Sequence, residues 1–202
     1  AIEVRPDDEG GGLPFVGQVD VRPGERATLP WEVGFALHPA ARGHGVMSAA
    51  LRIAAQWAFA HRAPSLYWLA ARGNFASWRV AHACGFTHHG TLPQRVPVRD
   101  GTADAWVASL LPGQPMTARQ PWVVPPVVEA DGLRLRPLRD DDTAIAEPHD
   151  HPPHHLPARA VPTPETFDDW LLRRRESMSI GRGSNWCIAD AGSDEPVGEA
   201  LV

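Results

Sequence analysis

Cysteine is scarce in this chain: Cys84 and Cys187 are the two cysteines among 202 residues. They stand far apart and neither belongs to a Cys-x-x-Cys pair, which argues against a disulfide scaffold and a zinc knuckle. Long apolar runs are missing too, because no stretch reaches the roughly 18 residues that a membrane-spanning helix needs. We therefore expect reduced core thiols and no membrane partner.

An excess of positive charge is absent as well. The net charge is −5 and the arginines are scattered, so no broad basic face is expected and nucleic acid is a poor candidate for the main partner. The N-terminus shows neither the basic segment nor the apolar run of a secretory signal. These absences lead us to expect a globular, cytoplasmic protein of one complete domain or two small ones.

Proline is concentrated in the middle of the chain. Residues 113–128 are rich in proline and lack amphipathic periodicity, which is typical of a semi-rigid linker. This linker would separate a first module, residues 1–112, from a second one, residues 129–202. A second irregular stretch, residues 148–164, is rich in proline and histidine and predicts a long loop.

Hydrophobic periodicity predicts the elements of the first module. In chain order they are strands at residues 2–5, 15–21 and 31–37, a helix over 46–61, a strand at 65–70, a helix from Asn74 to Gly85, and a hairpin of 96–99 and 105–111. The first helix would bury the face formed by Ala50, Ile53, Ala54, Trp57 and Ala58. The result is a meander followed by helices that pack on a sheet.

A glycine turn opens the first predicted helix. Gly43 and Gly45 are spaced by one residue between a strand and the helix that begins near Val46. Two glycines remove side chains that would keep backbone N–H groups away from an anion, and the positive end of the helix dipole would face it. A pyrophosphate suits such a turn, although a plain tight turn into a helix explains the same residues equally well.

The whole block from Glu32 to Leu111 resembles the GNAT superfamily, in particular the subgroup that includes ribosomal-protein N-terminal acetyltransferases. The elements that carry the resemblance are residues 32–39, Arg42-Gly43-His44-Gly45, Asn74-Phe75-Ala76-Ser77, Gly85-Phe86 and Asp104-Ala105-Trp106. One departure is Ala40, at a position where the family often has glutamine or arginine. The implied fold is α/β (α+β), a mixed, largely antiparallel sheet with a splayed central strand pair flanked by helices, here incomplete or permuted.

The resemblance also implies an activity and a cofactor site. The activity is transfer of an acetyl group from acetyl-CoA, as co-substrate and without a metal, to a primary amine by direct attack; the amine is a protein N-terminal α-amine or that of a small molecule. The residues implied to hold the pantetheine arm are Phe35, Ala36 and Leu37, those that cradle the pyrophosphate are Arg42, Gly43, His44, Gly45, Val46 and Met47, and Asn74 is a further contact.

The catalytic groups are less well defined. The resemblance implies that Ser77 is the general acid for the departing thiolate, but Ser77 could equally serve only the first helical turn. The position comparable to the base found in the subgroup falls near Val96, which cannot accept a proton. Glu32 and Asp104 remain as candidate bases, and each has an alternative role, as a solvated strand carboxylate or in a hairpin hydrogen bond.

The second module resembles the opening of the same fold. Residues 132–142 look like the first strand and the start of the first helix. Thr163-Pro164-Glu165 looks like a helix N-cap followed by proline at the first helical position. Residues 186–190 and 197–200 look like two further strands. We therefore interpret 1–112 as the C-terminal part of one GNAT domain and 129–202 as the N-terminal part of a second, a fragment of a tandem protein.

Two other functions remain open at this stage. One is a non-catalytic acyl-CoA-binding or interaction module, which would need the glycine turn but no acid or base. The other is metal binding by His149, His151, His154 and His155; a solvent-facing loop explains these histidines better, because they lack helical spacing and a companion cysteine. A homodimer or a second GNAT module is the expected protein partner.

Overall fold

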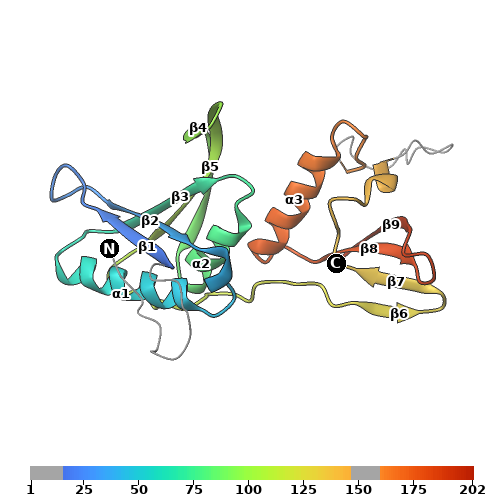
Figure 1. Cartoon of the computed structure of the whole chain (residues 1–202), viewed down its shortest axis with the longest axis horizontal. Helices are drawn as coiled ribbons and strands as arrows, with labels where there is room; N and C mark the ends of the chain where they lie inside the picture. Colours follow the sequence, from blue (N-terminus) through green and yellow to red (C-terminus); the bar gives the residue numbers. More distant parts are fainter. Residues whose placement is uncertain (1–15, 147–159) are drawn as a thin grey trace. The chain divides into compact units, whose positions relative to one another are not determined.

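The structure, a computed structural model, describes residues 16–146 and 160–202. It divides into two compact units, residues 1–119 and 120–202, which are treated separately below (Figure 1). The strand predicted at residues 2–5 and the four histidines between His149 and His155 lie outside the described residues. Within the described part, no helix is long and apolar enough to cross a bilayer, and no cluster of three or more His, Cys, Asp or Glu residues could hold a metal ion.

The first unit is a five-stranded mixed sheet with two helices (Figure 1). Its elements are β1 (Gly17–Arg22), β2 (Trp31–Leu37), the 3₁₀ turn η1 (Pro39–Ala41), α1 (Val46–Ala60), β3 (Leu66–Ala71), α2 (Phe75–Ala83), β4 (Thr87–Val98) and β5 (Gly101–Leu110). The strand order is β1-β2-β3-β5-β4, and β2–β3 is the parallel pair among antiparallel neighbours. The predicted class, a largely antiparallel mixed sheet flanked by helices, is confirmed.

The parallel pair β2–β3 splits partway along its length. Pairing runs from Trp31 opposite Leu66 to Val33 opposite Trp68 and ends there, although β2 continues to Leu37 and β3 to Ala71. On its other side β2 stays paired with β1 to its end. The peptide groups of the last part of β2 therefore face a gap in the ladder on the β3 side.

Both helices pack on one face of this sheet. Trp31 of β2 contacts Trp57 of α1, with ring centroids 6.2 Å apart, and Trp68 of β3 contacts Trp78 of α2 at 5.6 Å. Trp31 and Trp68 point to the same face, since Trp68 is opposite Val33 and strand side chains alternate. The predicted buried face of α1 was partly wrong, because Ile53 and Trp57 are more than half exposed. The buried positions are Met47, Ala50, Leu51, Ala54, Ala55 and Ala58.

Part of the predicted linker belongs to the first unit. The guanidinium of Arg52 in α1 donates to the carbonyl of Met116 at 2.9 Å and to that of Ala83 at 2.8 Å. Gly85 has a φ of +82°, and a Cβ there would lie 2.3 Å from the carbonyl oxygen of Pro115. Residues 115–117 are therefore packed closely behind the C-terminus of α2.

The second unit is a four-stranded antiparallel sheet with one helix. Its elements are β6 (Val128–Ala130), β7 (Leu133–Arg136), η2 (Thr143–Ala146), α3 (Phe167–Ser179), β8 (Asn185–Asp190) and β9 (Pro196–Leu201), and the strands pair in that order. Helix α3 starts later than predicted, because Thr163 to Thr166 form a separate turn and Thr166 is the N-cap. The core consists of Leu138, Ile145, Ala146, Phe167, Trp170, Leu171, Cys187 and Ala189.

A buried ion pair anchors the start of this unit. Arg136 and Asp142 are 2% exposed and joined by two hydrogen bonds, of 2.7 and 2.9 Å. Asp194 lies beside them and accepts from Arg134 and Arg136, at 2.9 and 3.0 Å, and from Arg139. These hydrogen bonds, that from Arg134 first, hold the pKa of Asp194 far below its usual range.

Candidate functional site

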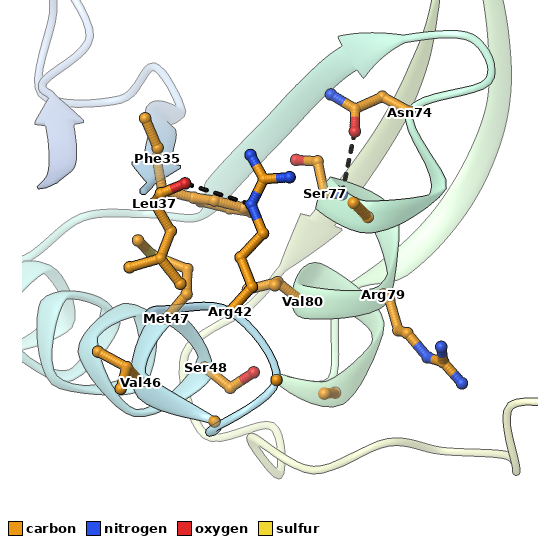
Figure 2. Close-up of a pocket in the computed structure, with 15 residues that line it drawn as sticks. Phe35, Leu37, Arg42, Val46, Met47, Ser48, Asn74, Ser77, Arg79 and Val80 are labelled. Carbon is orange, nitrogen blue, oxygen red and sulfur yellow. Dashed lines mark hydrogen bonds between the residues drawn. The ribbon is translucent and has the colours of Figure 1, made fainter. Parts of the chain in front are cut away.

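A cavity of about 630 Å³ opens where the split end of β2, the start of α1 and one face of α2 meet (Figure 2). Its lining residues are Phe35, Ala36, Leu37, Arg42, Gly43, Gly45, Val46, Met47, Ser48, Asn74, Ala76, Ser77, Arg79, Val80 and Ala83. The two ionisable side chains in this set, Arg42 and Arg79, are both arginines. Figure 2 shows the Arg79 side chain directed away from the other labelled side chains, so the positive charge at the cavity is that of Arg42, which suits an anionic ligand.

The glycine turn forms the floor beside α1. Gly43 and Gly45 have φ angles of +84° and +73°, and a Cβ built at either position meets no atom within 4 Å. Both positions therefore need glycine for their backbone conformation and leave open space above it. Gly45 is the N-cap of α1 and offers no side-chain hydrogen bond to the helix. The first N–H groups of α1 lack intrahelical acceptors, and they are available to an anion.

Arg42 ties this turn to the end of β2. Its Nε donates to the carbonyl oxygen of Leu37 at 3.3 Å, and Figure 2 shows its guanidinium between β2 and Ser77. One carbonyl at the open edge of β2 is thereby used within the protein. The peptide groups of Phe35 face the same side and lie beyond the last β2–β3 pair, so they could bind an amide-bearing ligand.

Ser77 is held at the cavity from two directions. Its backbone N–H donates to the Asn74 side-chain oxygen at 3.1 Å, so Asn74 is the N-cap of α2, as predicted from the sequence. Its hydroxyl accepts a hydrogen bond from the indole Nε1 of Trp68, also at 3.1 Å. Because a hydroxyl has one donor hydrogen besides its lone pairs, the hydrogen of Ser77 stays available to a ligand in the cavity.

Ten of the thirteen residues proposed from the sequence line this cavity. The three that do not are His44, Glu32 and Asp104. His44 is exposed. Glu32 forms a 3.0 Å ion pair with Arg22 on an exposed part of the sheet, and Asp104 accepts from the N–H of Gln94 at 3.0 Å within the β4–β5 hairpin.

Sequence reasoning missed five lining residues: Ser48, Ala76, Arg79, Val80 and Ala83. The last four lie on α2 at helical spacing, so they share one face with each other. That spacing was visible in the sequence, but the sequence analysis assigned no role to this face of the helix. Ser48 gives no such signal, because it lines the cavity through its place in the first turn of α1.

One family model matches the first part of the chain. Residues 1–87 match the family model described as the acetyltransferase (GNAT) domain. None of the curated proteins compared with the chain matches it.

Solved structures similar to the chain include the ribosomal-protein-S5-alanine acetyltransferase from Vibrio fischeri, with 21% identity over 48% of this chain and 55% of that one, at a TM-score of 0.46. Mycobacterium smegmatis RimJ in complex with CoA-disulfide gives 22% identity over 48% of each chain, also at 0.46.

The chain thus spans about half the length of these two structures, 55% and 48% respectively. The family match falls within the first unit, whose mixed sheet with a split central pair and two flanking helices is consistent with that fold. Residues 1–87 are therefore identified by their sequence as a match to the GNAT acetyltransferase domain.

Proposed function

We propose that the first unit binds acetyl-CoA and transfers its acetyl group to a primary amine. The observation that carries this proposal is the electropositive cavity in which the uncapped start of α1 and the unpaired end of β2 meet. A helix N-terminus suits a pyrophosphate, and open strand amides suit a pantetheine arm. The match of residues 1–87 to the GNAT domain supports the same ligand.

The reaction we propose is direct attack on the thioester. A neutral amine attacks the thioester carbonyl, the C–N bond forms, and the C–S bond then breaks. A backbone N–H near the split of β2 would stabilise the oxyanion, because a fixed donor in a water-poor site favours the charge that develops there. Ser77 would give its proton to the departing thiolate, which its available hydrogen and its position on the cavity wall support.

The acceptor we propose is an α-amine or a similarly weak base, on a peptide N-terminus or a small molecule. At pH 7 an α-amine of pKa about 8 is roughly one-tenth neutral, whereas a lysine amine of about 10.4 is neutral roughly once in 2,500. Since neither Glu32 nor Asp104 lines the cavity, either carboxylate could act as the base only indirectly, for example through water. An amine with a low pKa loses its proton readily and therefore depends least on a base in the protein.

The second unit belongs to a separate proposal. We propose that residues 129–202 are the N-terminal part of a second GNAT domain, so that the full protein carries tandem modules. The succession of strand, helix and two strands in β7, α3, β8 and β9 supports it. Limited proteolysis of a longer parent protein, followed by mass spectrometry of the fragments, would test whether a complete second domain follows.

The proposed activity is tested with two measurements on the same protein. Calorimetry with coenzyme A should give saturable binding, and a thiol-release assay with acetyl-CoA should show turnover with a hexapeptide that has a free α-amine. The same peptide with a blocked N-terminus and one lysine is the control, and a strong preference for it would contradict the proposed acceptor. Binding without turnover on any amine would instead support the non-catalytic acyl-CoA-binding module.

An arginine variant adds a check on the place of binding. Arg42→Gln should weaken coenzyme A binding, because it removes a positive charge from the cavity wall. Arg26→Gln changes the net charge equally at an exposed position between β1 and β2, outside the cavity lining, and should leave the affinity unchanged.

A further inference from the structure

A row of polar side chains crosses the whole sheet of the first unit. In register, Arg22 of β1 is opposite Glu32 of β2, Glu32 is opposite Tyr67 of β3, Tyr67 is opposite Ser109 of β5, and Ser109 is opposite Thr87 of β4. Residues directly opposite each other point to the same face of a sheet. We call these five residues the polar row.

The polar row lies on the face of the sheet opposite α1 and α2. Glu32 and Tyr67 alternate along their strands with Val33 and Trp68, and Trp68 contacts α2. The row is therefore on the other side of the sheet from the helices. It is not part of the cavity described above, since none of its members lines it.

His89 joins the polar row through an irregularity in β4. Pairing with β5 passes from His88 opposite Ala108 to Gly90 opposite Val107, so His89 is the extra residue of a β-bulge. Its Nε2 lies 2.6 Å from the hydroxyl oxygen of Ser109, and its ring centroid is 6.5 Å from that of Tyr67. Bulges redirect side chains, and here the bulge turns an imidazole onto the polar face.

On β2 and β3, the polar row lies next to the split in the sheet. Glu32 and Tyr67 form the pair immediately before the last one, Val33 and Trp68. Immediately after Val33 on β2, Gly34 leaves room for the guanidinium of Arg22, because a Cβ at residue 34 would lie 2.9 Å from Arg22 Nη2. The same guanidinium pairs with Glu32 at 3.0 Å. The Glu32–Tyr67 pair thus borders the point at which β2 and β3 part, on the face of the sheet away from α1 and α2.

We propose that His89 is the base that takes the proton from the acceptor amine through water, with the acceptor bound along the polar row. The proposal rests on the acetyl transfer proposed above. Ser109 is a positioning residue: its hydroxyl oxygen lies 2.6 Å from Nε2 of His89, and in the tautomer that donates from Nε2 the lone pair of Nδ1 is left to take the proton. Arg22 holds the Glu32 carboxylate in place at 3.0 Å, and Glu32 offers an acceptor to the N–H groups of the neutral amine.

The proposed step balances as follows. The amine nitrogen forms a bond to the carbonyl carbon, its surplus proton moves through water to Nδ1 of His89, and the C–S bond breaks as the thiolate takes a proton from Ser77. The imidazolium then loses its proton to water, and Ser77 regains one from water. No oxidant, reductant or metal enters the step.

A histidine variant with chemical rescue tests the base. In the thiol-release assay with the α-amine hexapeptide, His89→Ala should lower kcat about 100-fold, which is the low end for loss of a general base. Added imidazole should restore part of that loss. His61→Ala is the matched control, since His61 is exposed and stacks on Trp57 at the end of α1, on the helix-covered face. Unchanged kcat in His89→Ala, or a loss that imidazole does not relieve, overturns the proposal.

A second measurement follows acceptor binding without turnover. Tyr67 is the single tyrosine of the chain, so ¹³C-labelled tyrosine gives one ring signal in NMR. With coenzyme A present, titration of the hexapeptide should shift that signal, and an unmoved signal at saturating peptide counts against the polar row as the acceptor site. If the wild-type protein binds no coenzyme A by calorimetry, the proposed function itself fails; if it binds and turns over while His89→Ala matches it, only the present inference fails.

Discussion

The hydroxyl of Ser77 accepts a hydrogen bond from the indole of Trp68 at 3.1 Å, and Trp68 is in the last residue pair before β2 and β3 part. The side chain proposed as the acid is thus fixed to the point where the sheet splits. Because Trp68 is 1% exposed, its N–H has no access to bulk water. The Ser77 hydroxyl oxygen therefore has two roles: its hydrogen bond positions the proposed acid, and it pairs the buried N–H of Trp68.

Replacing that oxygen should therefore have two effects. Ser77→Ala is expected to lower kcat about 10- to 100-fold through loss of the acid, and to destabilise the first unit by about 1–3 kcal/mol because the indole donor is left unpaired. Steady-state kinetics and denaturant unfolding measure the two separately. Ser77→Thr keeps a hydroxyl and should recover most of both losses. Full activity in Ser77→Ala would remove Ser77 from the mechanism.

The glycine turn allows a controlled comparison of strain and binding. Gly45→Ala should destabilise the protein by about 1–2 kcal/mol, because a φ of +73° is unfavourable for alanine, and its methyl group would occupy the space offered to the anion. We expect coenzyme A affinity to fall tenfold or more.

Gly113→Ala is the matched control for that variant. Gly113 has a φ of +78° and no atom within 4 Å of a built Cβ, but it lies outside the cavity. It should show a similar loss of stability with unchanged affinity by calorimetry. Equal affinity losses in both variants would mean that strain alone explains the effect.

Asp194 should make the stability of the second unit depend on pH. Hydrogen bonds from Arg134, Arg139 and Arg136 lower its pKa in the folded state, so its contribution is present above the unfolded value of about 3.9 and is lost as pH falls below it. Asp194→Asn should therefore be less stable than wild type at pH 7, with a difference that shrinks on acidification below pH about 4. Denaturant titrations at several pH values measure it. Asp141→Asn, at an exposed site, should show no such trend.

Cys187 should be unreactive in the folded protein. Burial first, and then the nearby carboxylate of Asp142, raise its pKa to about 11, so at pH 8 roughly one molecule in a thousand carries the thiolate. Burial also raises the pKa of Cys84. Mass spectrometry after iodoacetamide treatment at pH 8 should find neither cysteine modified before denaturation and both modified after it. Rapid labelling of native Cys187 would show that the second unit opens frequently.

The sequence predicted best those features that depend on neighbouring residues. The bounds of β2, the cap at Asn74 and the glycine start of α1 follow from local rules, and the structure agrees with each. The class of sheet followed from a resemblance over the block that begins at Glu32. The cofactor residues were largely brought together in one cavity because they cluster at consecutive strand and helix ends.

What the sequence could not predict depends on tertiary contacts. The buried face of α1 was misplaced at Ile53 and Trp57, because hydrophobicity alone does not say which side of a helix meets the sheet. Nothing local indicates that Arg52 bonds to the carbonyl of Met116, which packs part of a proline-rich segment against a helix. The polar row could not be predicted either, because its residues are brought together only by the register of five strands.

The early end of the β2–β3 ladder has a consequence for ligand choice. Peptide groups of β2 after Val33 lack a strand on one side, and a guest with amides of its own can supply the missing partners. Coenzyme A carries two amides in its pantetheine arm, whereas ADP carries the diphosphate and none of them. Adenine nucleotides should accordingly compete poorly, although they share the charge that the helix end attracts.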